Sequence, residues 1–298
     1  MNRVFDYFKE HDVKHKRNLK ISEISSIKIG GAAAAVAYPG DERELIRLLD
    51  FLTSINFPYK VIGKMTNILA SDEGYPGVLI STQFLSMLEA AGEVVLAGSG
   101  LSVNSLLLSS AKMNLGGLEE LYGIPGTLGG LLHNNGGRGN FDLSCALLYA
   151  RVYSPSLKKI LTLDGFDLRL GYRSSAFFEN DYIALSLALA FVKREEPLVL
   201  RKIRAYQKER RTCQPLSYPS LGSIFKREGA VAVSRLIDEC GLKGRRVGGA
   251  EVSRKHAGFI INLGGARASD VLSLIALIKE EIYQNYGFLP KEEIEILN

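Results

Sequence analysis

The chain has 298 residues, of which 46% are hydrophobic and 23% charged, and its formal net charge is +5. This length and composition allow a large buried core and predict a globular protein of two or three domains. The longest apolar run, Tyr182 to Val192, is too short to span a bilayer, and the charged residues near the N-terminus exclude a signal peptide. We therefore expect a soluble, cytoplasmic protein without a membrane partner.

Cysteine and histidine are too dispersed to predict a disulfide framework or a metal site. Cys145, Cys213 and Cys240 lie far apart without a CxxC pair, which is typical of free thiols in a reducing compartment. The histidines lack the spacing of metal ligands; they are His11, His15, His133 and His256. We predict no bound metal.

The first regular elements predicted from the sequence are a strand, a helix and a second strand. Residues 34–38 form a short apolar strand, and Asp41 with Glu44 three residues later is typical of a helix start. Four leucines then recur at i, i+3, i+4 and i+7, which predicts an amphipathic helix over residues 42–54. Residues 59–62 form the second strand, and such a βαβ unit presents its next loop to a phosphate.

That next loop reads Gly63-Lys-Met-Thr-Asn67 and leads into Ile68-Leu69. Glycine allows close approach to the main chain, while the Thr66 hydroxyl, the Asn67 amide and main-chain N–H groups can donate to a pyrophosphate. An ordinary connection between strands of an α/β layer is the alternative interpretation of this loop.

Glycine recurs in two later runs, Tyr122–Gly130 and Asn134–Gly139. Ordering so many glycines costs chain entropy, so a flat or extended ligand lying along the bare main chain is the simplest explanation. Pro125 would fix the turn and Thr127 would offer a hydroxyl. Close packing of two layers is the alternative. Neither run follows GxGxxG, which disfavours a Rossmann NAD site.

Positive charge concentrates in residues 201–256, which contain fourteen Lys or Arg against five Asp or Glu, so this segment carries +9 and the remainder −4. Such a segment suggests an anionic partner. Residues 201–211 predict an amphipathic helix with Ile203 and Tyr206 on its apolar side, without the aromatic interleaving of single-strand binders. A phosphorylated or carboxylated small molecule is therefore favoured over nucleic acid, and a solvated charged face is the alternative.

Ser223 stands in a glycine-flanked turn within Tyr218-Pro-Ser-Leu-Gly-Ser-Ile-Phe-Lys226. A turn that exposes a hydroxyl beside cations can make serine a proton donor, because the cations stabilise the charge that develops opposite it. Hydrogen bonds that merely complete a turn or a helix cap are the alternative role for Ser220 and Ser223.

The last predicted helix covers residues 270–286, with five aliphatic residues on one face, and stops at Gly287. We expect its apolar face to be core, and the chain then to enter a strand around Glu293.

These motifs together resemble the UDP-N-acetylenolpyruvoylglucosamine reductase family. The order and spacing match from about residue 20 to the C-terminus. The chain resembles the shorter, type II form, because no long insertion separates residues 171–173 from the Ser223 turn. The segments that carry the resemblance are residues 63–69, Gly123-Ile-Pro-Gly-Thr-Leu-Gly-Gly130, Gly171-Tyr-Arg173, residues 214–226 and Gly241-Leu-Lys-Gly-Arg-Arg-Val-Gly-Gly-Ala250.

The resemblance implies an α+β chain with a vanillyl-alcohol-oxidase/PCMH-type FAD-binding fold. Two α/β subdomains, near residues 1–80 and 81–206, would hold FAD between the glycine-rich loops. A C-terminal α+β substrate domain, residues 207–298, would cover the flavin. The family's substrate carries a diphosphate and a carboxylate, which agrees with the basic segment. We expect a monomer.

The family's reaction is the NADPH-dependent reduction of UDP-N-acetylglucosamine enolpyruvate to UDP-N-acetylmuramate in peptidoglycan precursor synthesis, with both substrates using one pocket in turn. The resemblance implies that Ser223 delivers the proton, that Glu293 polarises or hydrogen-bonds the substrate carboxylate, and that Arg173 is the catalytic arginine. Glu293 is chosen over Glu292 because residues 294 and 296 would then continue a strand alternation, and a slip of one residue would reverse the face.

The resemblance also implies the remaining binding residues. Arg173, Lys226 and Arg227 would bind substrate, although Lys226 could equally be solvated. The implied FAD-binding residues are Gly63, Lys64, Met65, Thr66, Asn67, Ile68, Gly123, Ile124, Pro125, Gly126, Thr127 and Gly130.

Three ligand loops depart from the family's pattern. The first loop usually reads Gly-x-Gly-Ser-Asn, whereas this chain has Met65 and Thr66, and Met65 predicts weaker FAD binding. Arg227 replaces the usual asparagine, and residues 135–140 read Asn-Gly-Gly-Arg-Gly-Asn instead of Asn-Ala-Gly-Ala-Tyr-Gly. Another FAD oxidoreductase of the same fold, or a non-catalytic nucleotide-binding module, are the alternative functions.

Overall fold

Two units, each assembled from separate stretches of the chain, make up the computed structural model, which describes residues 1–298. The first unit contains residues 1–17, 35–64 and 77–208, and the second contains residues 18–34, 65–76 and 209–298. The boundary between them falls within the predicted cofactor loop. The division into three domains stays a prediction.

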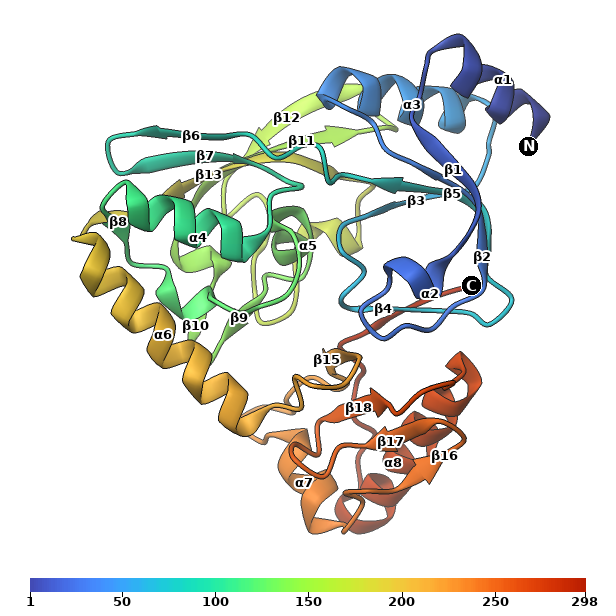
Figure 1. The fold of residues 1–298 in the computed structure, drawn as a ribbon, viewed down its shortest axis with the longest axis vertical. Helices are drawn as coiled ribbons and strands as arrows, with labels where there is room; N and C mark the ends of the chain where they lie inside the picture. Colours follow the sequence, from blue (N-terminus) through green and yellow to red (C-terminus); the bar gives the residue numbers. More distant parts are fainter. The chain divides into compact units, whose positions relative to one another are not determined.

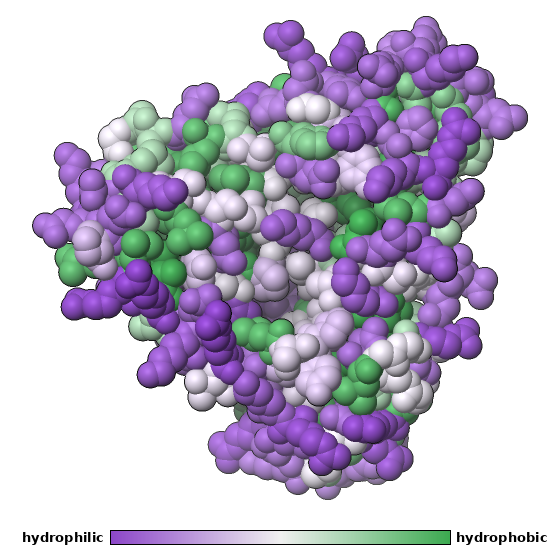
Figure 2. Space-filling view, viewed as in Figure 1, coloured by the Kyte–Doolittle hydropathy of each residue, from purple (hydrophilic) through white to green (hydrophobic).

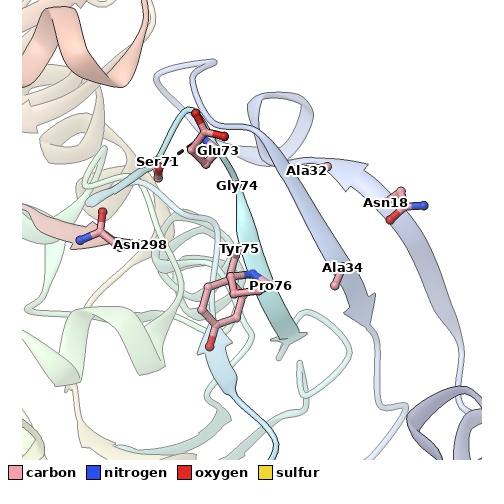
Figure 3. A pocket seen from close by; sticks show the side chains of 9 residues that line it. All are labelled: Asn18, Ala32, Ala34, Ser71, Glu73, Gly74, Tyr75, Pro76 and Asn298. Carbon is pink, nitrogen blue, oxygen red and sulfur yellow. Dashed lines mark hydrogen bonds between the residues drawn. The ribbon is translucent and has the colours of Figure 1, made fainter. Parts of the chain in front are cut away.

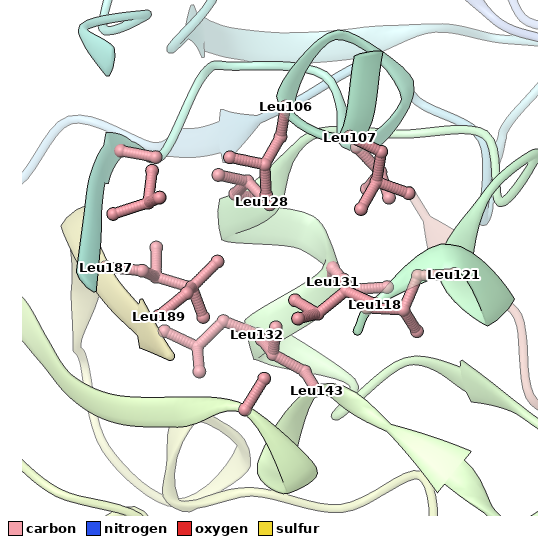
Figure 4. Packing of buried hydrophobic residues seen from close by; sticks show 14 of the residues in the cluster. Leu106, Leu107, Leu118, Leu121, Leu128, Leu131, Leu132, Leu143, Leu187 and Leu189 are labelled. Carbon is pink, nitrogen blue, oxygen red and sulfur yellow. The ribbon is translucent and has the colours of Figure 1, made fainter. Parts of the chain in front are cut away.

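The first unit is built on an antiparallel sheet in the order β12-β11-β13-β7-β6 (Figure 1). Two helices, α4 (Val103–Lys112) and α5 (Leu128–His133), cover one face of it. Leucines from these helices and from β13 converge into a buried core (Figure 4). The strands are β6 (Leu88–Ala91), β7 (Val94–Gly98), β11 (Leu147–Ser154), β12 (Lys159–Leu163) and β13 (Ile183–Ala190).

The predicted strand, helix and strand are β2 (Ala32–Ala37), α3 (Glu42–Ser54) and β3 (Tyr59–Ile62). Asp41 caps α3 by accepting the amide of Glu44 at 2.8 Å, and the four leucines of the helix are fully buried. The sheet order is β1-β2-β5-β3, with β1 (His15–Lys20) and β5 (Tyr75–Ser81). The predicted helix bounds are confirmed, but β2 and β3 are not neighbours, because β5 lies between them and pairs with β3 in parallel.

Short elements complete the first unit. The apolar side of α1 (Asn2–Glu10) joins α3 in a second buried core. The other elements are β8 (Leu115–Gly116), η1 (Glu119–Leu121), β9 (Gly137–Arg138), β10 (Phe141–Asp142), η2 (Leu143–Cys145), η3 (Ala176–Phe178) and β14 (Val192–Lys193).

The second unit contains a sheet in the order β15-β18-β17-β16, whose core is completed by α7 (Val233–Glu239) and α8 (Ala268–Tyr286). Separately, β4 (Ile68–Ala70) pairs in parallel with β19 (Glu295–Leu297), and α2 (Ile21–Ile24) precedes β2. The predicted C-terminal helix is confirmed: α8 begins two residues earlier than expected and stops at Gly287, whose φ is 75°. The sheet strands are β15 (Ser220–Ser223), β16 (Arg246–Val247), β17 (Ala250–Val252) and β18 (Phe259–Asn262).

The basic helix α6 (Glu196–Cys213) is longer than the predicted 201–211, and it buries Ile203 while Tyr206 is half-buried. Its exposed basic residues include Arg201, Lys202, Arg204 and Lys208, and a line of strongly hydrophilic side chains follows this helix in Figure 2. None of the helices combines the length and the apolar character needed to cross a membrane.

Candidate functional site

Gly63 and Thr127 bring the two predicted cofactor loops together within the first unit. A Cβ atom at Gly63 would stand 2.4 Å from Thr127 Oγ1, so a side chain at Gly63 would collide with it. Thr127 caps α5, and its Oγ1 accepts the amide of Gly130 at 3.4 Å. The bare main chain at Gly63 is thus a requirement of the contact between the two loops.

The second loop has the backbone shape that its glycines predict. Gly123 and Gly126 have φ values of 85° and 138°, which residues with a Cβ rarely adopt. Asn104, on α4, accepts the Gly123 amide through Oδ1 at 2.7 Å. Asn104 is not recognisable from the sequence, because nothing in its helical surroundings distinguishes it from a solvated asparagine.

Other glycines of the two later runs serve packing, as the alternative interpretation proposed. A Cβ at Gly136 would lie 2.5 Å from the Leu131 side chain, and one at Gly137 would lie 2.3 Å from the Phe141 carbonyl oxygen. A Cβ at Gly129 would lie 3.1 Å from that of Ser99. Glycine is therefore required in this region for two reasons: the positive φ values of the second loop, and the close packing of Gly129, Gly136 and Gly137 against their neighbours.

The first loop presents main-chain donors. The amides of Gly63, Lys64 and Met65 make no hydrogen bond to a main-chain carbonyl. Met65 has a φ of 47° and a side chain only 2% exposed, and its carbonyl accepts the amide of Ser26 at 3.3 Å. A methionine thus occupies a left-handed position that suits glycine, and its buried side chain holds it there.

These two loops fit the pyrophosphate and extended shape of FAD. Consecutive main-chain amides are the usual partners of phosphate oxygens, and glycine backbones permit their close approach. In the first unit, Gly123 and Gly126 have backbone conformations that favour glycine, and Thr127 of the second loop contacts Gly63 of the first.

Asn67 and Glu293 meet in the second unit although 226 residues separate them. The Asn67 side-chain amide donates to the carbonyl of Glu293 at 2.9 Å, and the amide of Glu295 donates to the Asn67 carbonyl at 2.9 Å. The amide of Glu293 in turn donates to the carbonyl of Ile224 at 2.7 Å. Asn67 at the end of the predicted cofactor loop, the main chain of Glu293 and the residue after Ser223 are therefore joined by direct hydrogen bonds.

Ser223 is the last residue of β15 and lies opposite Phe259 of β18. The register shifts between Ser220 and Ser223, and Gly222 has a φ of 80°. The prediction of a simple turn is wrong, because pairing with β18 makes this segment an irregular strand. Such an irregularity redirects a side chain relative to the regular pleat, and Ser223 is half-buried.

His256 supports the strand that carries Ser223. The Gly258 carbonyl accepts the Ile224 amide at 2.9 Å, while the Gly258 amide donates to Nδ1 of His256 at 3.1 Å. Burial lowers the pKa of His256, and the nearby Lys243 lowers it further. The neutral imidazole that results can accept this hydrogen bond.

Glu292, the neighbour of Glu293, forms an ion pair within the second unit. Its carboxylate lies 2.8 Å from Nζ of Lys279. The alternation argument for Glu293 is wrong, because Ile294 is buried whereas Ile296 is 42% exposed. Glu292 is thus engaged by Lys279, and the assignment of the catalytic role to Glu293 stays a prediction.

The predicted phosphate-binding residues follow Ser223 closely. The amide of Lys226 donates to the carbonyl of Lys291 at 2.9 Å, and Phe225 forms a bridge with Glu292. Lys226 is half-buried and Arg227 is exposed. Their roles toward a ligand stay predictions.

Arg173 belongs to the first unit, whereas Ser223 and Glu293 belong to the second. It has a φ of 50°, and its guanidinium donates to the carbonyls of Asn135 at 3.3 Å and Gly137 at 2.8 Å. The guanidinium also lies 5.2 Å from the ring centre of Tyr172. Its backbone and its head group are thus both held by neighbouring loops.

A pocket of about 480 Å³ in the second unit contains none of the predicted site residues (Figure 3). In Figure 3, Tyr75 and Pro76 lie close together at one end of β5, and Ser71 bonds to Glu73. The lining residues are Asn18, Ala32, Ala34, Ser71, Glu73, Gly74, Tyr75, Pro76 and Asn298. Glu73 and Tyr75 are the titratable side chains of this lining.

Comparison with known folds places the chain among flavoproteins. Residues 33–152 match the FAD binding domain. A berberine bridge enzyme variant, a reticuline dehydrogenase, is 13% identical with a TM-score of 0.52, covering 65% of this chain and 44% of its own, which shows a shared fold only. The α+β, vanillyl-alcohol-oxidase/PCMH-type FAD-binding fold predicted from the sequence is confirmed.

Comparison over the whole chain shows which family of flavoproteins it resembles. Residues 214–297 match the C-terminal domain of UDP-N-acetylenolpyruvoylglucosamine reductase. The reductase of Caldicellulosiruptor bescii is 36% identical over 98% of this chain and 93% of its own, and that of Syntrophomonas wolfei is 35% identical over 99% and 98%. The crystal structure of the Thermus caldophilus reductase has a TM-score of 0.81 at 29% identity, covering 96% of this chain and 99% of its own. The chain therefore belongs to the UDP-N-acetylenolpyruvoylglucosamine reductase family of oxidoreductases.

Proposed function

We propose that this protein reduces UDP-N-acetylglucosamine enolpyruvate to UDP-N-acetylmuramate with NADPH as reductant. The chemistry that FAD supplies when bound is two-electron transfer from NADPH to the enolpyruvyl double bond. The loop beginning at Gly63 and the loop from Gly123 to Gly130 would hold the cofactor, with main-chain amides directed at its pyrophosphate. The similarity to the reductases of Caldicellulosiruptor bescii and Syntrophomonas wolfei supports this proposed reaction.

Ser223, Glu293 and Arg173 would complete the reaction on the substrate. Addition of two electrons and one proton to the terminal vinyl carbon leaves negative charge on the carbon beside the carboxylate, and Arg173 would stabilise that charge. Ser223 Oγ would deliver a proton to this carbon, which completes the lactyl ether. Glu293 would hydrogen-bond the substrate carboxylate, and Lys226 and Arg227 would bind the diphosphate.

One geometric observation carries this proposal. The Asn67 side chain binds the Glu293 carbonyl, and the Glu293 amide binds the carbonyl of Ile224, next to Ser223. Asn67 and the main chains of Glu293 and Ile224, which are far apart in sequence, are therefore joined by hydrogen bonds within the second unit, and this supports a shared site for Glu293 and Ser223. Such fixed neighbours are what proton delivery close to a bound cofactor requires.

Substitution of Ser223 separates the two halves of the reaction. We expect Ser223→Ala to let NADPH bleach the flavin absorption normally, because this step needs no serine proton. Return of the absorption on addition of the enolpyruvyl sugar nucleotide should slow by ~10² or more, because the proton donor is lost. Anaerobic stopped-flow absorption measures both rates.

Ser220→Ala is the matched control, since Ser220 lies on the same irregular strand. It should leave both rates near those of the parent. Equal reoxidation rates in the Ser223→Ala variant and the parent would disprove the serine assignment. A purified protein that neither contains nor binds FAD would instead favour a non-catalytic nucleotide-binding module.

A further inference from the structure

Asn135 is buried beside residues 171–175, the turn that carries Arg173, and its backbone is in a left-handed conformation. Its exposed fraction is 1% and its φ is 40°, a left-handed conformation that asparagine tolerates better than most residues. It follows the end of α5, where its amide donates to the carbonyl of Leu132 at 3.1 Å. This hydrogen bond holds the main chain of Asn135 to the end of α5, and thereby helps to fix the position of its side chain.

The Asn135 side chain joins two other segments. Nδ2 donates to the carbonyl of Gly171 at 3.0 Å, and Oδ1 accepts the amide of Ser144 at 3.1 Å. Only a side chain with both a donor and an acceptor can make this pair of bonds. The bond to Gly171 reaches the first residue of the Arg173 turn.

The main chain of residues 133–137 binds the Arg173 guanidinium and a second residue of the turn. The guanidinium donates to the carbonyls of Asn135 and Gly137, and Ser175 Oγ donates to the carbonyl of His133 at 2.6 Å. The turn is thus held at its first, third and fifth residues by residues 133–137. Arg173 itself sits at a φ of 50°, so its backbone depends on such external bonds.

We propose that Asn135 is the positioning residue of Arg173: it fixes both the turn that carries the arginine and a carbonyl that orients its guanidinium. This inference rests on the role of Arg173 in the proposed function. Because a charged group stabilises a developing charge only at the correct distance and angle, loss of Asn135 should weaken catalysis without removing any group that touches substrate.

The test is Asn135→Gly, which removes both side-chain bonds but keeps a residue that tolerates the positive φ. We expect reoxidation of the reduced enzyme by the enolpyruvyl sugar nucleotide to slow by about 10- to 100-fold. Flavin reduction by NADPH should stay within about twofold, because the proposed role of Arg173 is to stabilise charge that develops on the sugar nucleotide. Asn135→Asp, which keeps the acceptor and loses the donor to Gly171, should slow the same half-reaction by a smaller factor.

Asp142→Ala is the matched control. Its carboxylate also accepts the Ser144 amide, at 3.1 Å, so this variant loosens the same loop without touching the Arg173 turn. Both half-reactions should stay within about twofold of the parent. Asn135→Gly should add no further loss when it is combined with Arg173→Ala, because a residue that acts only through Arg173 has nothing left to position.

The outcomes separate this inference from the proposed function. Slow reoxidation in Arg173→Ala beside normal reoxidation in Asn135→Gly would overturn the positioning role alone. Equal slowing of both half-reactions in Asn135→Gly would also overturn it, since that pattern indicates a general structural defect. Normal reoxidation in Arg173→Ala would overturn the role of Arg173 in the proposed function, and this inference with it.

Discussion

At Met65, backbone strain and side-chain burial have opposite effects on the free energy of unfolding. Its φ of 47° costs free energy for any residue with a Cβ, roughly 1–2 kcal/mol. Its side chain is 2% exposed, and removal of a buried methionine side chain costs about 2–5 kcal/mol. Burial outweighs the strain, so this chain stabilises the loop with a side chain where the family's pattern has flexible glycine.

We expect Met65→Gly to lower the free energy of unfolding of the apoprotein by about 1–3 kcal/mol, because lost burial exceeds relieved strain. Met65→Ala should be less stable again, by about 1 kcal/mol, since it loses the side chain and keeps the strain. Urea denaturation of the three apoproteins measures these differences. FAD titration should show Met65→Gly binding at least as tightly as the parent, and weaker binding would contradict the inference that Met65 weakens flavin affinity.

At the scale of elements, Asp72 joins the segment after the predicted cofactor loop to the start of α8 by hydrogen bonds. Its carboxylate accepts the amides of Ala268 at 2.7 Å and Ser269 at 3.1 Å, and Arg267 lies 3.6 Å away. Asp270 accepts the amide of Arg267 at 2.9 Å, so the first turn of the helix has two carboxylate partners. Together with the pairing of β4 and β19, this cap explains why residues 65–76 belong to the second unit.

Asp72→Ala should destabilise the protein by about 1–2 kcal/mol at neutral pH, because two helix amides lose their acceptor. Burial alone would raise the pKa of Asp72, but the hydrogen bonds from Ala268 and Ser269 outweigh it and the pKa is lowered from 3.8. The contribution of the charge is therefore present above pH 3.8 and is lost as the pH falls through the lowered pKa.

Asp72→Asn is the control, because it keeps an oxygen acceptor without the charge. The difference in urea midpoint between the parent and Asp72→Asn should be clear at neutral pH and shrink in strong acid. A difference that stays constant across this range would argue against a charge-dependent cap.

At the scale of the whole molecule, charge is unevenly distributed. Residues 201–256 carry +9, against −4 for the rest of the chain. Three of the five acidic residues that this sum already subtracts form ion pairs with cations of the same segment: Asp238 with Lys243, Glu239 with Arg235, and Glu251 with Arg246 and Arg254. The net positive charge of +9 is thus carried by cations in excess of these acidic residues, and it would attract a diphosphate-bearing substrate.

We expect the KM for the sugar nucleotide to rise several-fold between about 50 mM and about 500 mM salt, because salt screens the attraction between the basic segment and the diphosphate. Steady-state kinetics at saturating NADPH measures this, with sucrose of equal osmolarity as the control. A KM that is insensitive to salt, or that sucrose raises equally, would mean that the basic segment does not recruit the substrate.

Local patterns determined a large part of this fold. The bounds of α3 and β3 followed from a cap, a leucine period and a short apolar run, and the end of α8 followed from Gly287. Capping bonds and helical periodicity act over a few residues, so the sequence contains them directly. The family resemblance was likewise visible in the order and spacing of short motifs.

Only the tertiary structure decided how distant segments meet. The insertion of β5 between β2 and β3, the irregular strand at Ser223 and the exposure of Ile296 all depend on strand pairing across the chain. The bonds of Asn67 with Glu293, and of Asn135 with Gly171 and Ser144, join residues whose local sequences carry no sign of one another. Such contacts depend on the packing of the complete chain. Propensity and periodicity describe only how a residue relates to its neighbours in sequence.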